Sequence, residues 1–520
     1  LRADTKDMLS SKLLSITILS AALLLPGTQS GAGEPHDFFP DRQTRETLKH
    51  IYTTSYERNP SMLTWWDYET WSTIGVEGSF GKGRLHSPLT TDGTRGININ
   101  TESILHQDKT GWTFSGKFEY GIELNDSLRY TLSHGKRPYG SPSMFFCIAP
   151  AQKWELQHYT LAATASKKLG THWSAGVHLE YIGGKQFRKT DVRNEQSSLN
   201  IVLDAGATGV FGNNMLSAGL LYERNKEKPQ FSRIYNSGPN YTIYLMNGLG
   251  TQITKLETSP SWSQNIPGAY LGWARRGTHN RVNIKYSFKY GVDSWKSEST
   301  QNSTYQSKRT KYRFTSHGLD LTDILTLGCG GNMIFDGSFD FTAGNSSNWN
   351  NSANVFIEDY SALQFDAHAG ILYSNPVKWF RKVGVNADAT GFTRHDKNYD
   401  AKMDGINLYG DAFAGFGTKI GKADLSAEIH GGISSWLTAN YAPNAAKDGN
   451  NIYTTYIGRA EEAYMNTDTW HAGAGLNIEF PAGKTLINIG ASYSYTGTSA
   501  DNTYKGTKWQ SGKISLSVCF

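Results

Sequence analysis

Cysteine is scarce in this chain, and its copies lie far apart. The three cysteines of the 520 residues are Cys147, Cys329 and Cys519. None stands in a C-x-x-C pair, so neither a zinc site nor a disulfide framework is indicated. We expect three unpaired thiols.

Long apolar runs and net charge are also scarce. After residue 25, no run of about eighteen apolar residues occurs, so the body of the chain offers no membrane helix. The 51 basic and 46 acidic residues give a net charge of only +5, spread along the sequence. A charge so small and dispersed gives no reason to expect a nucleic-acid partner.

One shorter apolar run, residues 13–25, lies near the start of the chain. Lys12 precedes it, a Pro-Gly pair ends it, and the small residues Thr28 and Ser30 fit a cleavage after Ser30. This layout is that of a secretory signal peptide, because the run is too short to span a membrane. We predict a signal peptide over residues 8–30. A buried N-terminal helix of a globular domain is the alternative.

Aromatic residues and glycine are plentiful, with 28 Tyr and 54 Gly. This composition favours strands and turns over a helix-rich core. Many segments alternate strictly between apolar and polar residues, as in residues 280–290, where Val282, Ile284 and Tyr286 oppose Asn283 and Lys285. About eighteen such segments can be read, with sixteen or fourteen as alternatives. Each has roughly the ten residues with which a tilted strand crosses a bilayer.

The connections between these segments alternate between short and long. The short turns include 170–171, 212–214, 277–278, 421–422 and 481–484, and the long polar stretches are 125–153, 185–196, 226–265, 292–306, 344–359 and 437–468. In a meander, this alternation puts all short turns at one end, as in outer-membrane barrels. We predict an all-β fold in which residues 71–520 form a transmembrane antiparallel up-and-down β-barrel.

A soluble β-sandwich or propeller is the alternative architecture. Such a fold also encloses one face of each strand in a filled core. The polar faces carry charges such as Lys117, Glu180, Lys285 and Asp340, which such a core would leave unpaired. Apolar faces toward lipid and charged faces toward a wet lumen avoid this cost. We therefore expect outer-membrane lipid as a partner and the cell outer membrane of a Gram-negative organism as the location.

The last segment, residues 512–520, alternates strictly and finishes on Phe520. A terminal aromatic residue on an alternating strand resembles the C-terminal signal that is read by the barrel-assembly machinery. Phe520 is therefore the candidate assembly signal, and the resemblance implies this machinery as a partner.

Before the first strand, residues 34–70 combine a short helical pattern with an apolar cluster. Asp41 is suited to cap a helix over 42–54, and Pro60 stops it. The turn Asn59-Pro60-Ser61 resembles the N-terminal hatch of the fatty-acid-transporter barrel superfamily. Asn59, Pro60, Trp65 and Trp66 are the candidate hatch residues, because such tryptophans need a surface to cover. A periplasmic leader is the alternative.

From this turn to its last residue, the chain resembles an uncharacterised outer-membrane β-barrel family of Bacteroidota. That resemblance implies no settled activity and no site residues. The genes of that family lie near TonB-dependent receptors, which implies a role beside such a receptor.

Catalytic patterns are weak. Ser316 and His317 are adjacent, so on a strand they face opposite sides and form no nucleophile–base pair. His178, His430 and His471 fall on the predicted lumen face without a G-x-S-x-G or H-E-x-x-H motif. We predict no enzyme activity and no cofactor.

A calcium site is weakly indicated at residues 396–407. Asp396, Asn398 and Asp400 have calcium-loop spacing, but Ala401 replaces the expected glycine and Asn407 the expected glutamate. We therefore expect a solvated polar loop without a metal.

The connections indicate partners only in outline. Basic residues such as Arg188, Arg193 and Lys311 suit the phosphates of lipopolysaccharide at an outer rim. The amide-rich and aromatic stretch 226–265 is suited to fold into the lumen or to cover a neighbouring protein. We expect a porin-like channel or transport component for small polar solutes. The alternative is a non-conducting accessory subunit of an outer-membrane complex.

Overall fold

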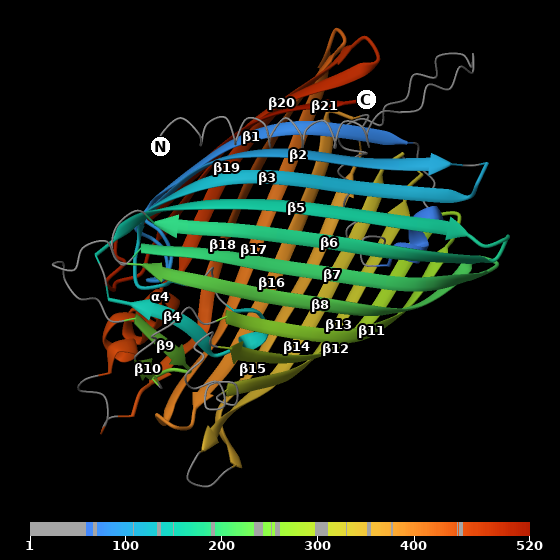
Figure 1. Cartoon of the computed structure of the whole chain (residues 1–520). Helices are drawn as coiled ribbons and strands as arrows, with labels where there is room; N and C mark the ends of the chain where they lie inside the picture. The colour runs from blue at the N-terminus through green and yellow to red at the C-terminus, as the bar shows by residue number, and fades with distance from the viewer. Residues whose placement is uncertain are drawn as a thin grey trace, which may run out of the picture.

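Eighteen antiparallel strands form one closed sheet in the computed structural model of the chain (Figure 1). The structure describes residues 59–65, 70–107, 109–132, 137–148, 150–188, 193–232, 243–250, 252–254, 261–296, 310–328, 330–350, 355–375, 378–444, 446 and 451–520. The barrel strands are β1 (Trp71–Gly83), β2 (Gly93–Gln107), β3 (Trp112–Leu128), β5 (Gln152–Lys168), β6 (Trp173–Arg188), β7 (Arg193–Phe211), β8 (Asn214–Ser232), β11 (Ser261–Arg276), β12 (Asn280–Lys296), β13 (Thr310–Thr326), β14 (Asn332–Asn350), β15 (Val355–Ser374), β16 (Phe380–Asp396), β17 (Ala401–Ile420), β18 (Ala423–Ala442), β19 (Thr469–Ala482), β20 (Thr485–Thr498) and β21 (Lys508–Cys519).

Each barrel strand pairs with its neighbours along the chain, and the last strand returns to the first. In the closing pair, β1 and β21, Val76 lies opposite Leu516. Just beyond the ladder, Ser72 and Phe520 exchange two backbone hydrogen bonds of 2.9 Å each. The sheet therefore has no free edge. The predicted up-and-down barrel and its eighteen strands are confirmed.

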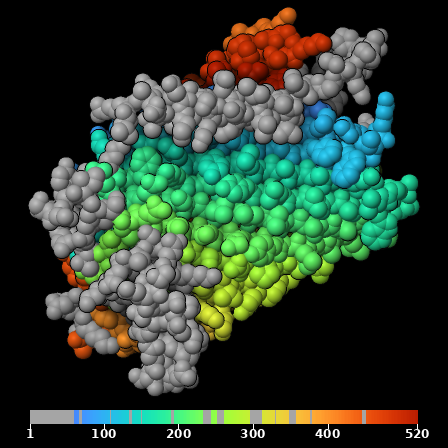
Figure 2. Space-filling view, in the orientation of Figure 1, coloured from blue at the N-terminus to red at the C-terminus, as the bar shows by residue number. Residues whose placement is uncertain are grey.

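The alternation read from the sequence sorts side chains to the two faces of the wall. On the outer face, Leu220 and Ile514 are 70% and 69% exposed, whereas Asp204 and Thr208 on the inner face are buried. Figure 2 shows the outside of strands β3 to β8 as a continuous wall. Among the described residues, no helix has the length and apolar character of a membrane span. The apolar exterior of the strands is the face suited to lipid.

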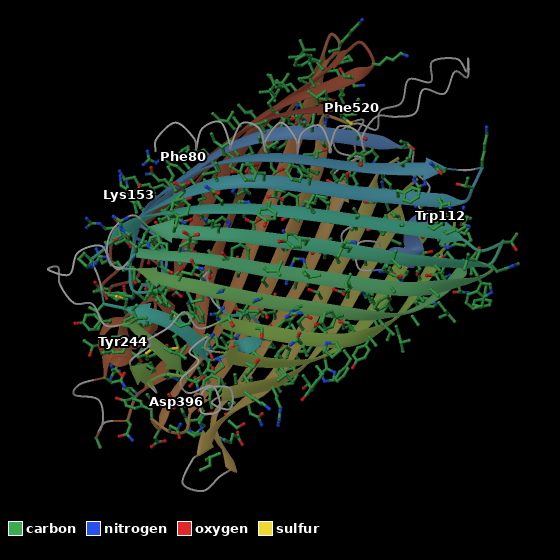
Figure 3. The ribbon with its side chains drawn as sticks, in the orientation of Figure 1. Phe80, Trp112, Lys153, Tyr244, Asp396 and Phe520 are labelled. Atoms are coloured by element: carbon green, nitrogen blue, oxygen red, sulfur yellow. The ribbon has the colours of Figure 1, made fainter. Side chains whose placement is uncertain are left out.

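The two ends of the barrel differ. The short turns, such as the one at Gly170, gather at one end, which we call the short-turn end. Figure 3 places Trp112 there, and Lys153, Tyr244 and Asp396 at the opposite, long-loop end.

A few small elements are not part of the barrel wall. They are the 3-10 helices η2 (Pro60–Trp65) and η3 (Pro138–Gly140), the π-helical turn η5 (Thr454–Gly458), the helix α4 (Arg459–Met465) and the short strands β4 (Ser143–Cys147), β9 (Ile243–Asn247) and β10 (Gln252–Thr254). The three short strands form a second sheet in the order β10-β9-β4, which we call the lid sheet.

The helical content differs from the expectation. The α-helix of the described residues, α4, belongs to the C-terminal part of the chain rather than to an N-terminal hatch. The described part of the N-terminal segment contains the six-residue 3-10 helix η2, which begins at Pro60, a residue tolerated in the first turn of a helix. The helix expected over 42–54 and the signal peptide expected over 8–30 lie outside the described residues.

Candidate functional site

Residues 59–65, which we call the plug segment, lie inside the barrel at the short-turn end. The main chain is held at Ser61, whose carbonyl oxygen accepts a hydrogen bond of 2.7 Å from the Ser174 hydroxyl on β6. The Ser61 hydroxyl lies 2.7 Å from that of Thr208 on β7. The Trp65 indole N–H donates to the Ser174 oxygen at 2.8 Å. Hydroxyl side chains on the wall thus form the hydrogen bonds of a short segment that has few backbone hydrogen bonds of its own.

The plug segment also has an apolar side. Met62 and Leu63 are buried in a cluster with lumen-facing apolar residues of five strands, which are Ile104, Met215, Ala274, Ile324 and Ile334. Apolar residues on an otherwise polar lumen face need a partner, and Met62 and Leu63 provide it.

Gly176 on β6 allows the plug segment to approach the wall. A Cβ atom at this position would lie 2.4 Å from the carbonyl carbon and oxygen of Pro60. The site therefore requires glycine as long as the plug segment is seated.

A second segment enters the lumen from the long-loop end. This roof segment, residues 137–142, contains η3, in which Tyr139 and Gly140 have φ angles of 57° and 72°. Arg137 forms a buried ion pair with Glu227 on β8, and its guanidinium lies 4.2 Å from the centre of the Trp262 ring. The tight left-handed turn thus depends on contacts with the barrel wall.

Tyr139 is the roof residue that reaches deepest. Its ring stacks on Phe314 with 4.5 Å between ring centres. Its hydroxyl donates to Glu223 Oε2 at 2.9 Å and accepts from Lys289 Nζ at 2.9 Å. Burial, reinforced by the Glu223 carboxylate, raises the pKa of this hydroxyl. The group therefore stays protonated at neutral pH and keeps its donor role.

The lid sheet covers the roof segment on the outside. Phe146 and Met246 of this sheet pack against Met403, Tyr441 and other residues at the rim of β17 and β18. Asp396 fixes the connection between β9 and β10, because Oδ2 accepts the Leu249 N–H at 3.0 Å. Of the stretch 226–265, residues 243–250 and 252–254 thus lie over the long-loop mouth, whereas residues 226–232 and 261–265 belong to the wall strands β8 and β11, so the expected loop is shorter than predicted.

Between the plug and roof segments lies a cavity of about 640 Å³, which we call the chamber. Its charged lining consists of the carboxylates Glu102, Glu180, Asp204, Glu223, Asp320, Asp340 and Asp366, the lysines Lys117, Lys285 and Lys289, and His178. Seven carboxylates against three lysines leave a formal excess of four negative charges with His178 neutral. The size is within the range of small-molecule sites.

A single wall strand contacts the roof segment, the chamber and the plug segment in that order along its length. Along the lumen face of β13, Tyr312 and Phe314 contact the roof segment, Ser316 and Asp320 line the chamber, and Ile324 meets the plug segment. One alternating strand therefore has three different inner environments.

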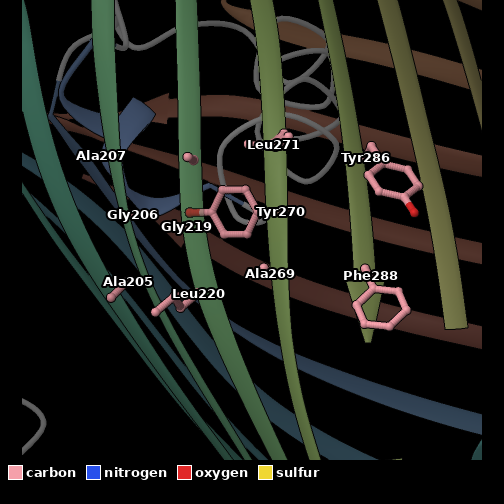
Figure 4. Close-up of a pocket in the computed structure, with 11 residues that line it drawn as sticks. Ala205, Gly206, Ala207, Gly219, Leu220, Ala269, Tyr270, Leu271, Tyr286 and Phe288 are labelled. Atoms are coloured by element: carbon pink, nitrogen blue, oxygen red, sulfur yellow. The ribbon is translucent and has the colours of Figure 1, made fainter. Parts of the chain in front are cut away.

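Tyr270 on β11 connects the chamber to the plug segment. Its hydroxyl donates to Asn59 Oδ1 at 3.4 Å and also faces the Asp204 carboxylate. The Lys285 ammonium lies 4.1 Å from the centre of its ring. Figure 4 shows the ring of Tyr270 lying across the neighbouring strands at Gly206 and Gly219, where a Cβ atom would come within 2.3 Å of it.

A family model matches residues 60–520 of this chain. The chain belongs to the family of unknown function DUF6850. None of the curated proteins matches the chain in sequence.

Solved structures resemble this DUF6850 chain in fold. The ferric preacinetobactin receptor of Acinetobacter baumannii has a TM-score of 0.42 and 8% identity, with 87% of this chain and 80% of that chain covered. The ferric yersiniabactin uptake receptor of Yersinia pestis has a TM-score of 0.41 and 8% identity, with the same coverage. A monoaromatic hydrocarbon channel has a TM-score of 0.31 and 10% identity, with 89% and 90% covered. The likeness at these scores carries no conclusion about the function of the DUF6850 chain.

The hatch candidates of the DUF6850 chain are only partly described. Asn59, Pro60 and Trp65 lie inside the barrel in the plug segment, whereas Trp66 lies outside the described residues. The similarity to the fatty-acid-transporter hatch, the Bacteroidota assignment and a gating role of these residues stay predictions. Phe520 lies at the closing seam with its side chain 40% exposed, and its role as an assembly signal stays a prediction too.

Three of the described histidines of the DUF6850 chain lie on wall strands and have local partners. His178 lies 2.8 Å from the Thr164 hydroxyl, and His471 lies 2.8 Å from Asp411. His317 contacts Tyr286 on the outer face while Ser316 lines the chamber, so the two face opposite sides as expected.

The expected solvated loop at 396–407 is wrong for Asp396. This residue is fully buried, and its two oxygens accept the N–H groups of Leu249 and Tyr399. The loop spacing reflects an anchor for the lid sheet rather than a calcium ligand set. Among the described residues, no group of three or more His, Cys, Asp or Glu side chains is placed to hold a metal ion.

The basic rim also differs from the expectation at one position. Arg188 is buried, with its guanidinium 5.4 Å from the centre of the Trp154 ring, so it is not available to lipid phosphates. Tyr139 and Tyr270 were missed entirely, because nothing in the local sequence around either residue indicates its distant partners.

Proposed function

We propose that the protein is an outer-membrane channel that passes small polar solutes through the chamber, with the plug segment controlling the short-turn end. The observation that carries this proposal is the order of layers inside the barrel: a charged cavity of about 640 Å³ lies between two inward-folded segments. A structural barrel has no need of a polar chamber, because apolar filling would cost less.

The outer membrane is part of the same proposal. An apolar outer face around a closed eighteen-stranded sheet supports it, since barrels of this size leave room for an aqueous lumen. Outer-membrane lipid, lipopolysaccharide at the long-loop rim and the barrel-assembly machinery are the partners that this location entails.

Gly176→Ala tests the function without replacing any residue of the chamber lining or of the plug segment. The added Cβ atom would lie 2.4 Å from Pro60 main-chain atoms, so the plug segment must leave its seat. In planar bilayers, we expect the variant to show a larger single-channel conductance than the wild type.

Gly475→Ala is the matched control. Gly475 also faces the lumen, on β19, but a Cβ atom there would meet its nearest neighbours at 3.7 Å, an ordinary contact. This variant should conduct like the wild type. If Gly176→Ala assembles normally and neither it nor the wild type conducts, the channel proposal fails.

A non-conducting accessory subunit is the second candidate function. It is favoured by the firm attachment of the roof segment, where an ion pair, a ring stack and two tyrosine hydroxyls hold six residues. In this case the partner that we propose is a TonB-dependent receptor. Co-purification of such a receptor with the affinity-tagged protein, together with absent conductance, would favour this second function.

A further inference from the structure

The short turns of the barrel are rich in basic residues. The exposed cations in these turns or directly beside them are Lys109, Arg275, Lys378, Lys419, Lys422 and Lys484. We call this set the basic rim. The described residues of the short turns include no aspartate or glutamate. The short-turn end therefore has an excess of positive charge at its surface.

The carboxylates nearest to these turns do not neutralise the basic rim. Asp424 is paired with the buried Arg381, with 2.7 Å between oxygen and nitrogen. Glu479 is only 7% exposed, and Asp323 is half-buried. In the described part of the chain, no member of the basic rim forms an ion pair. Its charge is therefore available to a partner from outside the chain.

The long-loop end has a different arrangement of charge. Exposed lysines there lie beside carboxylates, as in Lys397, 2.7 Å from Glu358, and Lys505, 2.7 Å from Asp501. The two ends thus differ in how their cations are compensated, and not only in the length of their connections.

Aromatic rings on the outer face lie close to the basic rim. Trp173 and Trp379, beside short turns, are 52% and 68% exposed. Figure 3 places Trp112 at the same end, and Lys167 Nζ lies 5.1 Å from the centre of its ring. Outward-facing aromatic rings mark the depth of the lipid headgroups around membrane barrels. The basic rim is therefore at headgroup depth on the short-turn side.

We infer that the basic rim binds anionic phospholipid headgroups in the leaflet that surrounds the short-turn end. This inference rests on the membrane location in the proposed function. The cations lie at the turns β2–β3, β11–β12, β15–β16, β17–β18 and β19–β20, which are spread around the closed sheet. A leaflet meets the barrel on all sides, whereas a compact acidic protein would meet one side only. The distribution of the cations thus favours lipid.

Electron paramagnetic resonance of the full chain in phosphatidylcholine vesicles tests the inference. The probes are spin-labelled phosphatidylglycerol and spin-labelled phosphatidylcholine, and the immobilised fraction of each gives its association with the protein. We expect phosphatidylglycerol to associate about fivefold more strongly, which corresponds to about 1 kcal/mol for one basic side chain near a membrane. Added salt should reduce this preference.

A quadruple variant removes the basic rim from three consecutive short turns. It combines Lys378→Gln, Lys419→Gln, Lys422→Gln and Lys484→Gln. We expect its preference for phosphatidylglycerol to be roughly twofold lower than that of the wild type, or lower still.

The matched control makes the same number of changes at the long-loop end. It combines Lys153→Gln, Lys185→Gln, Lys397→Gln and Lys505→Gln. Each of these lysines lies beside a carboxylate, so the control should keep the preference of the wild type. Both variants have the same net charge, which separates the position of the cations from their number.

Equal association of the two lipids with the wild type would overturn the inference. An equal loss of preference in both quadruple variants would also overturn it, because net charge rather than the basic rim would then be the cause. If phosphatidylglycerol shows no preference, but soluble poly-glutamate binds the wild type and not the first variant, the partner is a soluble acidic chain and the inference fails.

Conductance separates this inference from the channel. If the lipid preference is found and neither the wild type nor Gly176→Ala conducts, the channel proposal fails and the inference stands. If Gly176→Ala conducts and the preference is absent, the inference alone fails. A chain that does not insert into vesicles would remove both.

Discussion

At the scale of single residues, Tyr139 shows how much of the lumen depends on one side chain. Its φ of 57° is uncommon for a residue other than glycine, and the strain of such a turn is of order 1–3 kcal/mol. The stack on Phe314 and the bonds to Glu223 and Lys289 offset this cost. The residue is therefore a fixed point of the roof segment.

Tyr139→Phe should keep the ring stack and lose the hydroxyl. Glu223 and Lys289 then lose a buried partner, so we expect the free energy of unfolding to fall by about 1–3 kcal/mol. Urea unfolding in detergent, followed by tryptophan fluorescence, measures the change. Tyr493→Phe on the outer face is the control. An unchanged midpoint in Tyr139→Phe would show that the hydroxyl does not hold the roof segment.

Residues of the plug segment were predictable in part, and the tyrosines were not. Asn59, Pro60 and Trp65 were selected by a local signal, a proline turn beside an apolar cluster. Tyr139 and Tyr270 take their roles from partners that lie far away in sequence, such as Glu223 for Tyr139 and Asn59 for Tyr270. Only the register of the closed barrel brings these groups together.

At the scale of elements, the period of two predicted the barrel strands because each has one face in lipid and one in the lumen. The lid sheet was not predicted. Its strands β4, β9 and β10 have five, five and three residues, too short for a period to be read. β9 and β10 pair locally, but β4 pairs with β9 from a connection far away in the chain, which local sequence cannot indicate.

The orientation of the elements gives a labelling prediction. Lys505 lies in the β20–β21 connection at the long-loop end, and Lys484 lies in the β19–β20 turn at the short-turn end; both are exposed. In intact cells, a membrane-impermeant maleimide should label Lys505→Cys strongly and Lys484→Cys only after lysis. The wild type, which contains Cys147, Cys329 and Cys519, gives the background labelling in both conditions. The reverse pattern would invert the topology.

At the scale of the whole molecule, closure depends on the last residues of the chain. Phe520→Asp should lower the amount of assembled barrel, because it alters the candidate assembly signal. The direct cost of a charge near the interface is only about 0–1 kcal/mol, so most of the loss must come from recognition. The heat-modifiable band on gels measures assembly, and Phe80→Asp, on the outer face of β1, is the control for the charge itself. Equal assembly of Phe520→Asp and the wild type would remove Phe520 as a signal.

The β1–β21 seam also determines when this chain can finish folding. Thr73 pairs with Cys519, so the first strand has one partner missing until the last strand has been made. During that interval the unpaired N–H and C=O groups of β1 are open to other chains. Contacts of such long range also slow folding, because a very long loop must close before they form. A chaperone bound to the open edge of β1 would shorten the time during which other chains can pair with that edge and aggregate.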